Sequence, residues 1–121
     1  MKTKLQNLIK SLLDLHKALL DFEREHYEKK NGPISSNNEY FGLVVNHEDF
    51  QWLRVLSELI ALLDEESEQT EINLDKVKEL SADLKAILSA DDETEFSLKY
   101  KLAKVKNENI AKLDVQVKAE L

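Results

Sequence analysis

Glycine and proline are nearly absent from this chain: two Gly and one Pro occur in 121 residues. All-β and α/β folds need such residues at their many turns, so the scarcity indicates long helices joined by few connections. Hydrophobic residues make up 42% of the chain and charged residues 34%, a composition typical of a globular protein rather than a disordered one.

The spacing of apolar residues predicts five helices, of which the first two are well delimited. The first spans about residues 3–30 and ends at the Asn-Gly-Pro sequence of residues 31–33, which combines a left-handed turn with a residue that cannot continue a helix. A short second helix is predicted at about 37–46, where Ser36 opens a capping box. Gly42 within it predicts close packing against a neighbour.

Three further helices follow along the chain. The third is predicted at about 48–67, with a wide apolar stripe that makes it the central element. Asn73 caps the fourth, and the fifth carries an apolar stripe as far as Leu121. Asn107 and Asp114 interrupt that stripe, which indicates frayed last turns or pairing with a partner chain.

The sequence therefore predicts an all-α fold, an antiparallel helical bundle of four long helices plus one short helix. A chain of this length favours one domain, residues 1–121, and buries roughly two thirds of the surface that its unfolded form exposes. Residues 1–68 carry the unusual polar positions, and residues 73–121 have the pattern of a plain helical hairpin.

Charge and composition exclude several classes of function. The net charge of −7 argues against nucleic-acid binding, which depends on clustered Lys and Arg. The absence of Cys excludes disulfides, thiolate zinc sites and cysteine nucleophiles. No stretch approaches the roughly 20 apolar residues of a membrane helix, and residues 1–15 lack the apolar block of a signal peptide. We therefore expect an acidic cytoplasmic protein that binds neither nucleic acid nor membranes.

Three polar residues fall on the apolar face of the first predicted helix: His16, Glu23 and Tyr27. They lie within about 60° of the direction of its leucines on a helical wheel. A buried carboxylate without partners costs several kcal/mol, so Glu23 needs partners, one of them from another helix. Arg54 is the candidate partner, although a wheel places it outward, where it would pair with Glu58 instead.

Two interpretations of this group stay open. One is a buried polar network that fixes the register of the helices. The other is a tuned acid/base group or a small-ligand pocket between helices. The residues assigned to the network or pocket are His16, Glu23, Tyr27, Trp52, Arg54 and Ser57.

Metal and nucleophile chemistry find weaker support. Glu23-x-x-His26 is half of the signature of di-iron carboxylate bundles, but no second copy occurs, so a metal site at Glu23 and His26 is an alternative that needs a homodimer. Ser36 and Ser57 are the plausible nucleophilic hydroxyls, and neither lies in a strained elbow motif. We therefore expect no enzyme and no cofactor.

A longer pattern joins several of these residues. It reads His-x6-Glu-x3-Tyr at 16–27, Gly-Pro at 32–33 and Trp-Leu-Arg-x-Leu-Ser at 52–57, followed by acidic residues. Over about residues 12–66 the chain thereby resembles an uncharacterised bacterial family of small all-helical proteins, a domain of unknown function. That family has Pro near the start of the third helix and after the Arg, where this chain has Glu48 and Val55. The resemblance implies an all-helical fold and a cytoplasmic location, and it implies no reaction.

The function expected from the sequence is a non-enzymatic protein-interaction or regulatory module, with a protein partner or a homodimer. Long amphipathic helices, an acidic surface and the lack of a catalytic motif favour it. The alternative is a metal- or small-ligand-binding bundle centred on Glu23, His16 and Tyr27.

Overall fold

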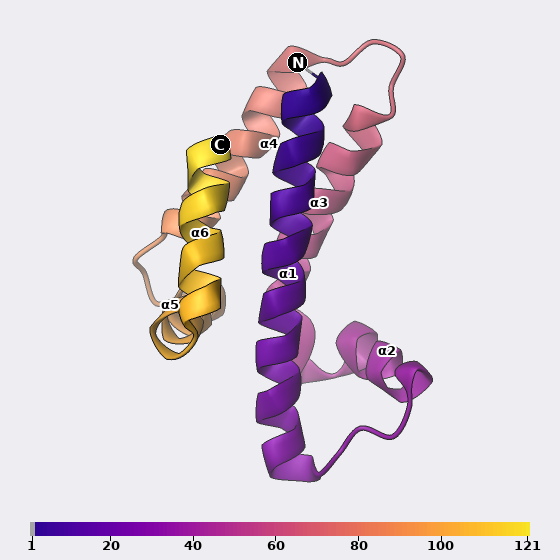
Figure 1. Ribbon diagram of the computed structural model, residues 1–121, viewed down its shortest axis with the longest axis vertical. Coiled ribbons are helices and arrows are strands. Elements are labelled where there is room, and N and C mark those ends of the chain that lie inside the picture. Colours follow the sequence, from indigo (N-terminus) through magenta and orange to yellow (C-terminus); the bar gives the residue numbers. More distant parts are fainter. Residues whose placement is uncertain (1) are drawn as a thin grey trace.

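The computed structural model describes residues 2–121 (Figure 1). Within that range the chain forms six α-helices, one 3-10 helix and no strand, which confirms the predicted all-α class. The elements are α1 (Lys2–Asn31), α2 (Asn37–Asn46), η1 (Glu48–Leu53), α3 (Arg54–Ser67), α4 (Leu74–Ser89), α5 (Glu95–Lys106) and α6 (Glu108–Glu120). None of the helices in the described range is long and apolar enough to span a membrane.

Helix α1 is the longest helix and contacts α3, α6 and η1. Both α3 and α6 pack along it and run in the opposite direction (Figure 1). Helix α4 packs on α3 and α5, and the apolar faces of α1, η1, α3, α4, α5 and α6 meet in one core. The residues that α1 buries in this core recur at helical spacing: Leu5, Leu8, Ile9, Leu12, Leu15 and Leu19.

Helix α2 stands apart from this core. It extends sideways near the C-terminal end of α1, packs mainly against η1 and contains no fully buried residue (Figure 1). Ser36 caps it as predicted, because its Oγ accepts the N–H of Glu39 at 3.1 Å. Gly32 takes the predicted left-handed backbone, with a φ of 87°, and lets the chain leave α1. The packing prediction for Gly42 is wrong, since a Cβ there would meet no heavy atom of a neighbour within 4 Å.

The predicted third helix begins as a 3-10 helix. Residues 48–53 form η1, and regular α-helix begins only at Arg54. His47 opens η1, because its Nδ1 accepts the N–H of Asp49 at 3.1 Å. Phe50, Trp52 and Leu53 are all buried within these six residues, so the tighter winding turns a dense apolar group toward the core.

The predicted fifth helix is two helices, α5 and α6, so the predicted count of four long helices plus one short is wrong. Asn107 makes the break: it leaves helical geometry at φ −132° and ψ 107°, and its Oδ1 accepts the N–H of Ile110 at 3.1 Å. Asp114, the second interruption of the apolar stripe, is buried and hydrogen-bonded to Tyr100. Neither residue marks a frayed end.

Candidate functional site

Glu23 is buried, and its partners come from two other elements. The residue is only 5% exposed, and its Oε1 accepts the indole N–H of Trp52 from η1 at 2.7 Å. The ammonium of Lys99 from α5 lies 3.7 Å from the same oxygen and 5.8 Å from the centre of the indole ring. One carboxylate therefore joins α1, η1 and α5.

Arg54 is not the partner of Glu23. It lies at the surface, where its Nε is 3.5 Å from a carboxylate oxygen of Glu58. This is the outward position that the helical wheel indicates. Trp52 belongs to the network that the sequence predicts, but its role as the donor to Glu23 was not predicted. Lys99 was not predicted at all, because it lies in a helix that is distant in the sequence.

His16 and Ser57 line a separate cleft. It has a volume of about 240 Å³ between α1 and α3, and apolar side chains such as Ile9 and Ile60 form much of its wall. Desolvation by burial lowers the pKa of the His16 imidazole from its ordinary value. The hydroxyl of Ser57 donates to the carbonyl oxygen of Arg54 at 2.9 Å.

Tyr27 contacts aromatic side chains rather than Glu23. Its ring meets His47 edge-on at 5.2 Å and lies 6.1 Å from the ring of Phe50. The six residues that the sequence assigned to one site are thus divided among the Glu23–Trp52 contact, the His16–Ser57 cleft, the aromatic cluster at Tyr27 and the surface at Arg54.

A row of aromatic rings leads from Trp52 to a second buried carboxylate. Phe96 lies 5.6 Å from Trp52 and stacks on Tyr100 at 5.3 Å. The Tyr100 hydroxyl donates to Oδ1 of Asp114 at 2.5 Å. Burial, followed by this hydrogen bond, raises the pKa of Tyr100 well above its ordinary value.

Two lysines neutralise this second carboxylate. The ammonium of Lys118 lies 3.1 Å from Oδ2 of Asp114, and that of Lys104 lies 3.9 Å from the same oxygen. Sequence reasoning did not assign a role to this group. The sequence signal for this group is Asp114, because a carboxylate on an apolar stripe needs a hydrogen-bond donor, as Glu23 does.

A groove lies between the C-terminal half of α1 and α5, beside Glu23. It consists of two clefts of about 280 and 330 Å³, which share Phe22 and His26 in their walls. Apolar surface comes from Phe22, Trp52 and Leu102. We call this the α1–α5 groove; its basic wall residues are His26, Lys29 and Lys30 of α1 and Lys99 and Lys106 of α5.

The outer face of α5 continues this apolar surface. Leu98, Leu102 and Val105 recur at spacings of four and three residues, so they form one stripe on the helix. Their exposed fractions are 53%, 44% and 84%. Because the opposite face of α5 already buries Phe96, Tyr100 and Ala103, this helix is apolar on two sides. Leu102 belongs both to the stripe and to the α1–α5 groove.

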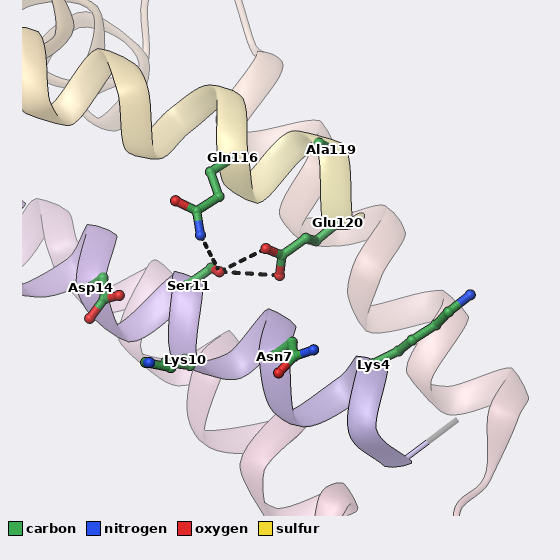
Figure 2. A pocket seen from close by; sticks show the side chains of 8 residues that line it. All are labelled: Lys4, Asn7, Lys10, Ser11, Asp14, Gln116, Ala119 and Glu120. Atoms are coloured by element: carbon green, nitrogen blue, oxygen red, sulfur yellow. Dashed lines mark hydrogen bonds between the residues drawn. The ribbon is translucent and has the colours of Figure 1, made fainter.

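A cleft of about 540 Å³ between α1 and α6 has a different character (Figure 2). Its centre is Ser11, whose buried hydroxyl donates to the Glu120 carboxylate at 2.9 Å and accepts from Nε2 of Gln116 at 3.2 Å. Lys4 extends away from this group in Figure 2. The hydrogen bonds of Ser11 with Gln116 and Glu120 tie the start of α1 to the end of α6.

Within the described range, no three His, Asp or Glu side chains are grouped so that they could hold a metal ion. Glu23 shares one cleft of the groove with His26. Comparisons with protein-family models, with curated proteins and with solved structures found no match to the chain.

Proposed function

We propose that this protein is a non-enzymatic protein-interaction module, and that it docks a partner on the α1–α5 groove and the outer stripe of α5. The observation that carries the proposal is the second apolar face of α5. Exposed apolar side chains are common singly, but a stripe that continues into an apolar groove is typical of an interaction surface.

The state of the buried carboxylates supports a non-enzymatic role. Glu23 and Asp114 each accept a hydrogen bond from an aromatic side chain and lie beside lysine ammonium groups. A carboxylate held in this way serves as a link between helices. Glu23 fixes α5 against α1 through Lys99 and thereby defines the α1–α5 groove.

The proposal is tested by cross-linking in cells of the source organism. A photoreactive amino acid replaces Val105 on the stripe, and the matched control replaces Val115, which is 68% exposed on α6. We expect a discrete adduct at position 105, either with another protein or with a second copy, and none at position 115. A strictly monomeric protein that gives no adduct at position 105 contradicts the proposal.

A second candidate function is a small-ligand site at the Glu23 end of the groove. The observation in its favour is that His26, Lys30 and Lys99 converge on one cleft of about 280 Å³. The two lysines suit a small carboxylate or phosphate ligand, which would compete with Asp49 for Lys30 and with Glu23 for Lys99. A screen of such anions by thermal shift tests it: a ligand whose stabilisation disappears in Lys30→Gln supports this function, and no shift with any anion contradicts it.

A further inference from the structure

We infer that the occupant of the α1–α5 groove is an acidic amphipathic helix of a partner protein. This inference rests on the proposed function and adds the chemistry of the partner. Its starting point is the contrast between a chain of net charge −7 and a groove in which lysines outnumber carboxylates. The groove is lined by Lys29, Lys30, Lys99 and Lys106, and by Glu23, Glu25 and Asp49.

Three of the four groove lysines are available to a partner, since only Lys99 is held by the buried carboxylate of Glu23. Lys106 forms no ion pair with any residue of the described range. Lys29 pairs with Glu25 at 3.5 Å and Lys30 pairs with Asp49 at 3.4 Å, and more than half of each lysine side chain is exposed. Exposed pairs of this kind contribute little, so carboxylates of a partner can replace them at small cost.

The shape of the surface favours a helix. A helix that lies in a furrow between two others contacts it through residues at i, i+3, i+4 and i+7. The exposed side chains of the stripe, Leu98, Leu102 and Val105, have the spacing i, i+4 and i+7 themselves. A partner helix with one apolar face can therefore cover the stripe while its acidic flanks meet Lys29 and Lys106.

Charge also distinguishes this partner from a second copy of the chain. A two-fold contact of α5 against α5 would bring Lys101 and Lys106, which border the stripe, close to the same lysines of the other copy. An anionic membrane is disfavoured because the α1–α5 groove is a furrow between two helices, which the surface of a bilayer does not enter.

The test is a titration of isotope-labelled protein, followed by amide NMR shifts, with a synthetic helical peptide of about five turns. The peptide carries Leu and Phe on one face and Glu on its flanks. One control peptide has the same composition, but its apolar residues are scattered around the helix. The other control peptide has Lys in place of every Glu. We expect shifts on both walls of the groove with the first peptide only, and binding that weakens as salt is added.

Paired variants test the two parts of the surface. The double variant Lys29→Glu, Lys106→Glu should weaken peptide binding about tenfold or more. The control is the double variant Lys78→Glu, Lys85→Glu, which makes the same charge change on exposed residues of α4. It should change peptide binding by less than about twofold. Val105→Glu should abolish the shifts at Leu102, and Val115→Glu should leave them unchanged. Retained folding of each variant is checked by circular dichroism.

Four outcomes would overturn the inference. They are equal binding of the scattered peptide, no shifts in the groove at millimolar peptide, concentration-dependent self-association that Val105→Glu abolishes, and preferential binding to phosphatidylglycerol vesicles. The cross-linking experiment keeps the two proposals separate. A protein adduct at position 105 together with any of these outcomes leaves the interaction module standing and removes the acidic helix as its occupant.

Discussion

The indole N–H of Trp52 donates to the carboxylate of Glu23 at 2.7 Å, and this bond joins residues 29 positions apart in the sequence. Both side chains are buried. A buried carboxylate with a neutral donor and one partly exposed lysine is stable only while both contacts persist. The bond therefore fixes η1 against α1 and holds Lys99 at the edge of the α1–α5 groove.

Replacement of Glu23 by Leu should destabilise the fold. The change leaves the Trp52 N–H without an acceptor in the core, so we expect the free energy of unfolding to fall by about 2–4 kcal/mol. Glu25→Leu, an exposed neighbour on the same helix, should change it by less than about 0.5 kcal/mol. Urea unfolding followed by circular dichroism measures both. A Glu23→Leu protein as stable as wild type, or more so, would mean that the carboxylate is kept for binding and would favour the small-ligand site.

The hydrogen bond between Tyr100 and Asp114, which joins α5 to α6, can also be tested by its effect on the free energy of unfolding. Tyr100→Phe removes the donor of the 2.5 Å bond, and we expect it to lower the free energy of unfolding by about 1–2 kcal/mol. Tyr27→Phe is the matched control, because Tyr27 is only partly buried and makes aromatic contacts that a phenyl ring retains. The interpretation fails if both substitutions have the same small effect.

The elements that the sequence predicted well are those whose ends carry local signals. Gly32 and Pro33 mark the end of α1, Ser36 caps α2 and Asn73 caps α4. Each signal acts through one or two residues, so sequence alone suffices. The break between α5 and α6 was missed although Asn107 is also a cap, because the apolar stripe continues on both sides of it.

The partners of Glu23 could not be read from the sequence for a different reason. The burial of its carboxylate follows from the helical period, but the identity of the donor depends on how η1 is wound. The sequence pattern predicts a regular α-helix from residue 48, and six residues of 3-10 helix change the direction in which Trp52 points. Lys99 reaches the carboxylate only through the packing of α5, which no local pattern encodes.

The cap at Asn107 should contribute measurably to stability. Asn107→Ala removes the side-chain acceptor of the Ile110 N–H, and we expect a loss of about 1 kcal/mol. Asn109→Ala, at an exposed position in the first turn of α6, should be neutral or slightly stabilising because Ala favours helix. Thermal or urea unfolding distinguishes the two. A neutral Asn107→Ala would show that packing of α6 on α1, rather than the cap, decides where α5 ends.

His16 should make stability depend on pH. Burial lowers the pKa of its imidazole below 6.5, so the folded protein disfavours the charged form. Between the ordinary pKa and the lowered one, the unfolded chain binds more protons than the folded chain. The free energy of unfolding should therefore fall as the pH falls through this window, and the contribution of His16 should be fully present above 6.5.

The measurement is urea unfolding at a series of pH values from about 7.5 downward, for wild type and His16→Leu. The difference between the two proteins isolates His16 from the carboxylates, which titrate in both. His16→Leu should lose part of the pH dependence that wild type shows. Equal slopes for wild type and His16→Leu would show that water reaches the imidazole freely, and the cleft it shares with Ser57 would then be open to solvent.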